Sequence, residues 1–179
     1  MTPPPNAVPP IPEGYHTVTP WIITSDTARL LDFVKHAFGA EILGSPVYNQ
    51  DGTIGHAEAR IGNSIVMAFD QRTEWETPCF LRLYVPDGDA VYEQALAAGA
   101  TSITEMTTMF WGDRVGRVRD PLGNIWWLQT RLEQVDQEEM QKRAQEKKYI
   151  DAMKYVQDSL DGEMKRRAEA ARRPGGAHA

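Results

Sequence analysis

The sequence predicts an α+β protein made of two tandem βαβββ modules, followed by a helical extension at the C-terminus. Three observations lead to this prediction. A β-hairpin pattern occurs twice in the chain, the same strand and helix pattern precedes each hairpin, and the residues after Thr130 become charged and helical in character.

The hairpin pattern is clearest in the segment Gly112–Thr130. Alternating residues end at Arg119, the turn-forming residues Asp120–Asn124 follow, and an apolar stretch comes next, an order that is typical of a hairpin. The earlier segment Ile54–Met67 aligns with Val115–Leu128 without a gap, at an offset of 61 residues. We infer that one hairpin is used twice.

The repeat extends to the segments that precede each hairpin. In both modules an apolar strand leads to an aspartate at a helix start, and the helix ends at a Gly-Ala pair. The aspartates, Asp26 and Asp87, keep the offset of 61, whereas Gly39 and Gly99 differ by 60, so the second helix has lost one residue. Asp26 is expected to cap the first helix through its side chain.

The pattern also gives the individual elements in chain order. The first module is expected to contain a strand at His16–Thr24, a helix at Thr27–Phe38, a strand at Glu41–Tyr48, a turn at Asn49–Gly52 into the third strand, and a strand at Ser64–Phe69. The second module is expected to contain a strand at Phe80–Val85, a helix at Ala90–Ala98, a strand near Ser102–Thr107 and the hairpin already described.

The segments outside the modules differ in composition. Residues 1–13 hold six prolines, which predicts a disordered or polyproline-II arm. The two modules are expected at residues 14–72 and 78–132 of one domain spanning 14–132, with a polar linker over 70–78.

The C-terminal residues 133–172 predict an amphipathic helix, because apolar residues recur at steps of three to five from Met140 to Met164. A break near Asp161-Gly162 is the alternative to a continuous helix. The apolar stripe of this helix must be buried on its own domain, on a sister subunit, or on another protein. Residues 173–179 form a tail.

Composition limits the classes of function. The hydrophobic fraction is 41% and the formal net charge is −6, which argues against a general nucleic-acid surface. No apolar run approaches the ~20 residues that a membrane span needs. The single cysteine, Cys79, has no partner for an internal disulfide, and no signal peptide is visible, so we expect a cytoplasmic protein.

The paired modules and the closing segment DRVGRVRDPLGNIW resemble the vicinal oxygen chelate superfamily, which includes glyoxalase I, extradiol dioxygenases and the fosfomycin and bleomycin resistance proteins. The resemblance covers roughly residues 15 to 132. It implies that the modules form a curved mixed sheet whose concave cleft is the site, and that the protein is a homodimer. It does not choose among the chemistries of the superfamily.

The same resemblance places four metal-ligand positions, on the first and last strand of each module, at Thr19, Val66, Phe80 and Trp127. None of these residues is a histidine or a carboxylate, and together they cannot supply the converging donors that a divalent transition metal needs. We therefore expect no metal and no cofactor.

Strand alternation then divides the side chains between two faces of the sheet. We expect an apolar face against the helices, made of Ile22, Ala57, Ala59, Ile61, Ile65, Met67, Phe69, Leu81, Leu83, Val85, Val118, Trp126 and Leu128. The concave face is expected to hold Thr19, Trp21, His56, Glu58, Arg60, Val66, Phe80, Arg82, Tyr84, Arg117, Arg119, Trp127 and Gln129.

An aromatic and charged cleft suits a planar organic ligand, because rings stack on tryptophan and guanidinium groups offer paired donors to anions. The expected ligand-binding residues are Thr19, Trp21, Phe80, Arg82, Trp111, Arg117, Arg119, Trp127 and Gln129. Phe80 and Trp127 alternatively fill the sheet core. His56 and Glu58 are candidates for an acid/base pair, the alternative being that Glu58 pairs with an arginine of the other module.

Three functions follow from these observations. The favoured one is a metal-free binding protein similar to the bleomycin resistance branch, which sequesters a small molecule in the aromatic and arginine-lined cleft. The second is a lyase or isomerase similar to glyoxalase, with His56 and Glu58 as acid and base. The third is an interaction protein that acts through its C-terminal helix.

Overall fold

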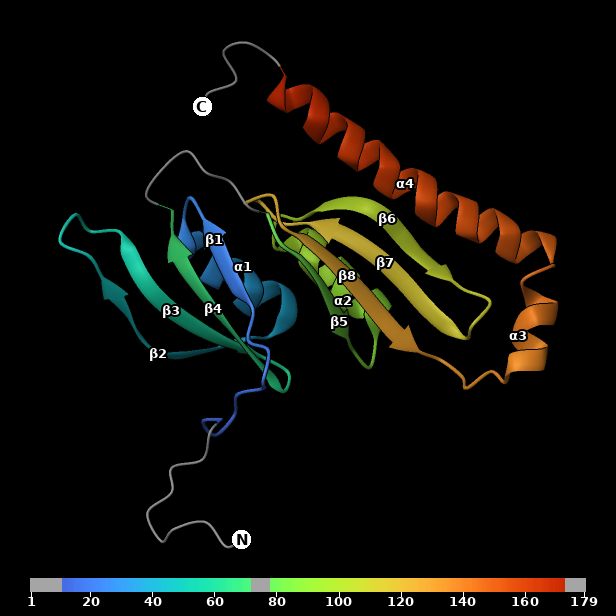
Figure 1. Ribbon diagram of the computed structural model, residues 1–179, viewed down its shortest axis with the longest axis horizontal. Coiled ribbons are helices and arrows are strands. Elements are labelled where there is room, and N and C mark those ends of the chain that lie inside the picture. Colours follow the sequence, from blue (N-terminus) through green and yellow to red (C-terminus); the bar gives the residue numbers. More distant parts are fainter. Residues whose placement is uncertain (1–10, 72–77, 173–179) are drawn as a thin grey trace, which may run out of the picture. The chain divides into compact units, whose positions relative to one another are not determined.

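The computed structural model describes residues 11–71 and 78–172 (Figure 1). The proline-rich residues 1–10, the linker residues 72–77 and the tail 173–179, for which the sequence made predictions, lie outside these ranges. The chain divides between Pro78 and Cys79 into two compact units, and each unit is described by itself. Within the described residues, no helix is long and apolar enough to cross a membrane.

The first unit is one βαβββ module. Its elements are β1 (Trp21–Thr24), α1 (Thr27–Phe38), β2 (Glu41–Tyr48), β3 (Ile54–Ile61) and β4 (Ser64–Asp70). The strand order is β1-β4-β3-β2, with β1 parallel to β4 and the other pairs antiparallel. Leu30 and Val34 of α1 are buried, as are Ala57 and Ala59 of β3, so α1 covers one face of the sheet.

The second unit repeats this module and adds two helices. Its elements are β5 (Phe80–Tyr84), α2 (Gly88–Ala97), β6 (Thr101–Thr108), β7 (Asp113–Arg119), β8 (Ile125–Arg131), α3 (Gln137–Arg143) and α4 (Lys147–Ala171). The strand order β5-β8-β7-β6, again with the outer pair parallel, matches that of the first unit and confirms the tandem repeat.

The helix starts follow the predicted capping. The carboxylates of Asp26 and Asp87 accept hydrogen bonds from the backbone N–H groups of Arg29 and Ala90, at 2.9 and 3.0 Å. The first helix ends at Gly39, whose φ of 64° lies in the left-handed region that glycine adopts without strain. The predicted bounds of α1 and β2 are confirmed.

The first strand is shorter than predicted. It begins at Trp21 rather than His16, so Thr19 lies outside the strand. Pro20 explains the difference, because it has no N–H to donate and restricts the residue before it. Instead the Thr19 hydroxyl donates to the His16 carbonyl at 3.2 Å, and only the Pro20 carbonyl joins the sheet, accepting from Met67.

The two hairpins have loops of different length, which the gapless alignment concealed. In the first unit Ile61 pairs with Ser64, so two residues form the loop. In the second unit Arg119 pairs with Ile125 across five residues. A shift of one residue in strand pairing moves every side chain of the strand to the other face of the sheet. The predicted assignment of the β4 side chains to the two faces is therefore wrong.

The register gives the corrected faces of β4. Val66 and Ala68 pair with Ala59 and Ala57 and lie on the side of α1. Ile65, Met67 and Phe69 belong to the opposite face, and the Phe69 ring lies 5.6 Å from that of Trp21. Trp21 and Arg82 are equivalent positions of the repeat, and they pair with Met67 and Trp127, respectively. Met67, rather than Val66, is therefore the counterpart of Trp127.

The C-terminal extension breaks earlier than predicted. Two helices, α3 and α4, meet near Ala144, and α4 continues through Gly162. A glycine in a helix interior costs only about 1 kcal/mol relative to alanine, which the tertiary contacts of α4 on either side of it can offset. These contacts include those of Ser159 and Glu163 with the sheet.

Helix α4 packs on its own unit, along β6 (Figure 1). Val156 is buried in a cluster with Met109 and Val115, and Trp111 and Trp127 pack against it. Helix α2 covers the opposite face, where Tyr92 donates to Ser102. The apolar stripe of the C-terminal helix therefore packs in part on its own unit, around Val156, whereas Met164 stays 51% exposed. The helix lies on the face of the sheet where we expect the ligand.

Candidate functional site

Trp127 lies at the centre of the open face of the second unit, the face opposite α2. It is paired with Arg82 on one side and Arg117 on the other. The guanidinium carbon of Arg82 lies 4.4 Å from the centroid of the indole, and that of Arg117 lies 4.0 Å from it. Both distances are within the range of cation–π contacts.

Phe80 extends this aromatic surface along the edge strand. Its ring is stacked near Trp127, with the centroids 6.2 Å apart and the planes inclined by 27°. Phe80 is 49% exposed, Tyr84 is 61% exposed, and Arg82 between them is also exposed. The β5 edge of the face therefore presents aromatic rings and a guanidinium group to solvent.

The other half of the face is covered by α4. Arg117 is only 3% exposed, and its Nη1 donates to the Thr104 hydroxyl at 3.1 Å and to the Val156 carbonyl at 2.7 Å. Burial, together with the nearby charge of Arg82, lowers the pKa of Arg117 to about 10. Arg117 remains charged at neutral pH.

Three buried polar atoms around Trp127 have no hydrogen-bond partner in the described part of the chain. They are Nε of Arg117, Nε1 of Trp127 and Oε1 of Gln129. Two are N–H donors and one is an acceptor. An unsatisfied buried polar group costs roughly 1–3 kcal/mol, so this cluster would be stabilised by a ligand or an ordered water molecule.

Three further residues expected at the site are engaged elsewhere in the unit. Arg119 forms an ion pair with Glu163 of α4, with Nη1 and Oε1 3.1 Å apart. Trp111 packs against the Val156 cluster, and the Gln129 amide donates to Asp113. Of the ligand-binding residues predicted on this unit, Phe80 and Arg82 are exposed, whereas Trp111, Arg119 and Trp127 are half-buried.

The open face of the first unit carries a different set of groups. Nε2 of His56 lies 2.9 Å from Oε1 of Glu58, and the Trp21 ring lies 5.5 Å from the His56 ring. A hydrogen bond from the Tyr15 phenol lowers the pKa of Glu58, His56 lowers it further, and burial opposes both. The same contact raises the pKa of Tyr15.

Tyr15 was not identified from the sequence. It precedes β1, where the two modules share no aligned residues, and its N–H donates to the Pro12 carbonyl in a turn. Pro12-Glu13-Gly14 could have indicated that turn, but no pattern connects Tyr15 with Glu58. Both partners found for Glu58, His56 and Tyr15, belong to the first unit.

The residues at the expected metal-ligand positions do not fit a divalent metal. With the corrected register they are Thr19, Met67, Phe80 and Trp127, of which Met67 offers only a soft thioether. Over residues 11–71 and 78–172, no group of three or more His, Cys, Asp or Glu side chains is placed to hold an ion. We derive no chemistry through a metal at these positions.

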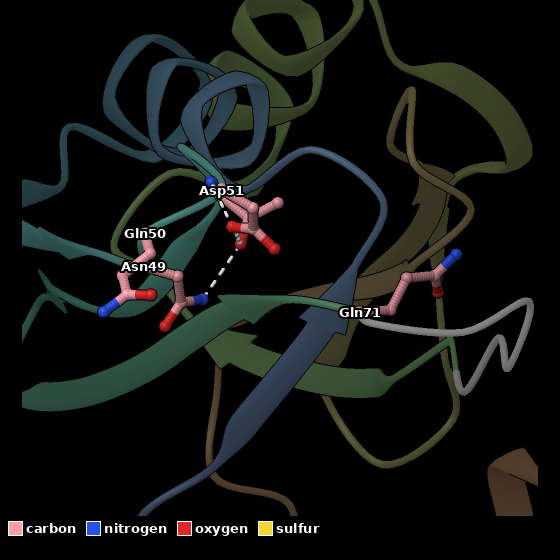
Figure 2. A pocket seen from close by; sticks show the side chains of 5 residues that line it. Asn49, Gln50, Asp51 and Gln71 are labelled. Atoms are coloured by element: carbon pink, nitrogen blue, oxygen red, sulfur yellow. Dashed lines mark hydrogen bonds between the residues drawn. The ribbon is translucent and has the colours of Figure 1, made fainter.

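A polar hollow of about 570 Å³ lies elsewhere in the first unit, at the β2–β3 turn (Figure 2). Its lining residues are Asn49, Gln50, Asp51, Thr53 and Gln71. Asp51 accepts hydrogen bonds from the N–H and hydroxyl of Thr53, and Asn49 donates to the same hydroxyl. These bonds hold the turn, and the hollow contains none of the predicted site residues.

Comparison with known sequences agrees with the fold. Residues 15–128 match the model of the Glyoxalase/Bleomycin resistance protein/Dioxygenase superfamily. An uncharacterized protein of Mycobacterium tuberculosis strain H37Rv is 35% identical over 136 residues, which cover 69% of this chain and 79% of that protein. A similar uncharacterized protein of Mycobacterium bovis is also 35% identical over 136 residues, covering 69% of this chain and 89% of its own.

Solved structures give the same result. TioX from Micromonospora sp. ML1 superposes with a TM-score of 0.56 and 26% identity, covering 64% of this chain and 98% of TioX. A glyoxalase/bleomycin resistance protein/dioxygenase family enzyme from Burkholderia phytofirmans PsJN shares the fold at a TM-score of 0.52 and 20% identity, covering 66% and 98% of the chains. The chain belongs to the glyoxalase/bleomycin resistance protein/dioxygenase superfamily.

Proposed function

We propose that the protein binds a small organic molecule on the open face of its second unit, without a metal, and sequesters it. The observation that carries this proposal is the exposed row of Phe80, Arg82 and Tyr84 beside Trp127. Aromatic rings at an exposed position are costly to leave in water and favourable to cover with a flat ligand.

The chemistry of this face supports binding rather than catalysis. Phenylalanine and tryptophan rings exchange no protons, and an arginine stays protonated at neutral pH, so Phe80, Arg82 and Trp127 are poor general acids or bases. They are well suited to stacking and charge recognition. Their positions on paired strands also hold them in a fixed geometry, which favours a binding role.

The test is a fluorescence titration of the intrinsic tryptophans with a panel of aromatic small molecules. We expect saturable binding by the wild-type chain and a loss of affinity of at least about fivefold in Phe80→Ala, because a stacked ring contributes roughly 1–3 kcal/mol. The control is Tyr48→Ala, which removes a ring that is 63% exposed on β2 of the first unit. Equal affinities of the two variants would contradict the proposal.

A lyase or isomerase activity on the first unit is the second candidate function. It rests on the 2.9 Å contact of His56 with Glu58, because a histidine held by a carboxylate is a common general base. Glyoxalase-type hemithioacetals are the substrates to test, with and without added divalent metal. Turnover abolished by both His56→Ala and Glu58→Gln would support this candidate, and turnover unchanged by them would exclude it.

A further inference from the structure

We propose that the ligand of the second unit is a planar aromatic anion, such as an aryl carboxylate, with its charged group at Arg82 and its ring along Phe80 and Trp127. This inference rests on the proposed function and specifies the ligand class. The first argument comes from charge. Arg82 and Arg117 both contact the indole of Trp127, yet neither forms an ion pair with a described carboxylate.

Several other arginines of the same unit are paired with carboxylates. Arg114 makes two hydrogen bonds to Asp89, at 2.6 and 2.7 Å, Arg119 faces Glu163, and Arg143 faces Glu133 and Glu139. The chain as a whole carries a formal charge of −6, so carboxylates are plentiful. Two neighbouring guanidinium groups without a counter-charge at an exposed aromatic face are therefore a local positive site, and an anion there relieves their repulsion.

The second argument comes from the unpaired atoms of the same cluster. The buried Nε of Arg117 and Nε1 of Trp127 are donors without acceptors among the described residues. Because both atoms are buried, a bridging water molecule would connect them to an anionic oxygen, which is the partner that N–H donors favour. Arg117 itself is held by α4, since its Nη1 donates to the Val156 carbonyl, so it acts as a fixed positive charge behind the indole.

The third argument concerns shape. Arg82 is exposed, and its guanidinium group can offer paired N–H donors to a carboxylate. Phe80 and Tyr84, on either side of Arg82 along the same strand face, give the ring of a ligand an aromatic surface. A small inorganic anion would leave these rings uncovered, which is why we infer an aromatic anion rather than a free phosphate.

The experiment is isothermal titration calorimetry of the full chain with 2-naphthoate and its neutral analogue 2-naphthamide. We expect the acid to bind at least about tenfold more tightly than the amide in low salt. Arg82→Gln should abolish this preference, and Arg82→Lys should keep part of it. Lys165→Gln, which removes a positive charge from an exposed position of α4, is the charge-matched control and should leave the preference intact.

Three other outcomes would overturn the inference, and one of them would also contradict the proposed function. Equal affinity for acid and amide, unchanged by Arg82→Gln, would overturn the inference while the proposed function stands. Binding of neither compound at millimolar concentration would contradict both. Inorganic phosphate that binds as tightly as 2-naphthoate would show an anion site without an aromatic component, and would overturn the ligand class proposed here.

Discussion

Arg117 stacks on Trp127 with its guanidinium carbon 4.0 Å from the indole centroid, and the same guanidinium group donates to the Val156 carbonyl of α4. The C-terminal helix thus supports the residue at the centre of the candidate binding face. In this chain, a helix outside the βαβββ repeat covers part of that face.

Glu163 is expected to hold α4 in place in a pH-dependent way. It is 1% exposed; burial raises its pKa, but hydrogen bonds from Arg167 and Arg166 and the charge of Arg119 outweigh burial, so the net pKa is lowered. Its stabilising contribution is therefore present above the usual value of 4.5 and is lost as the pH falls through the lower folded-state pKa.

Glu163→Gln should reduce the free energy of unfolding at pH 7 by roughly 1–3 kcal/mol, since it removes charge from a buried network. The difference from wild type should shrink in acid. Urea unfolding at a series of pH values from 7 down to about 2 measures this, because the contribution is lost only below 4.5, with the exposed Glu169→Gln of α4 as control. A difference that stays the same over the whole pH range would contradict the role of the Glu163 charge.

Val156→Ala tests whether α4 belongs to its own unit. Val156 is buried with Met109 and Val115, so its truncation should cost about 1–3 kcal/mol of stability. The comparison is Ile150→Ala, because Ile150 is on the same helix and 52% exposed. If Val156→Ala were as stable as Ile150→Ala, the helix would not be docked in solution and recognition of another protein would regain support.

Asp120 organises the second hairpin. Its carboxylate accepts from the backbone N–H groups of Leu122 and Asn124, from the Asn124 amide and from the Trp126 indole. Asp120→Ala leaves these donors without their acceptor and should destabilise the protein by roughly 2–5 kcal/mol. Thermal unfolding checks this, and a loss no larger than in the exposed Asp161→Ala would be inconsistent with the observed hydrogen bonds.

Tyr15→Phe should change the titration of Glu58. Because the Tyr15 hydrogen bond is the largest contribution that lowers the pKa of Glu58, its removal should move that pKa up toward 4.5. Carbon-detected NMR titration of the glutamate side chains measures the shift. The control is His36→Ala, because His36 lies on α1 and contacts Asp32 rather than Glu58. In this variant Glu58 should titrate as it does in the wild-type protein.

Most of the fold could be predicted because it is encoded locally and twice. The capping aspartates, the Gly39 helix end and the turn after Arg119 are short-range signals, and their recurrence at a fixed offset gave the module. The sheet face on which each β4 side chain lies could not be predicted in the same way. The two hairpins align in sequence without a gap, but their loops differ in length. In the structure β4 is therefore shifted by one residue relative to its position in that alignment with β8.

The candidate site was harder to predict because two of its determinants are long-range. The apolar stripe of α4 indicates that the helix needs a partner surface, but not that this surface is the one around Arg117. In the corrected register Glu58, paired with Met67, is the counterpart of Arg117, paired with Trp127. The gapless repeat, with its offset of 61, aligned Glu58 with Arg119 instead, so it indicated the opposite charges but not which arginine is the counterpart.

The most direct test of the binding proposal is the indole N–H signal of Trp127 in a two-dimensional ¹H–¹⁵N NMR spectrum, followed while 2-naphthoate is added. The chain has five tryptophans, so the signals are few and Trp127→Phe assigns the one of interest. The proposal predicts a saturable shift of the Trp127 signal. A saturable shift of the Trp21 signal while that of Trp127 stays unmoved would contradict it.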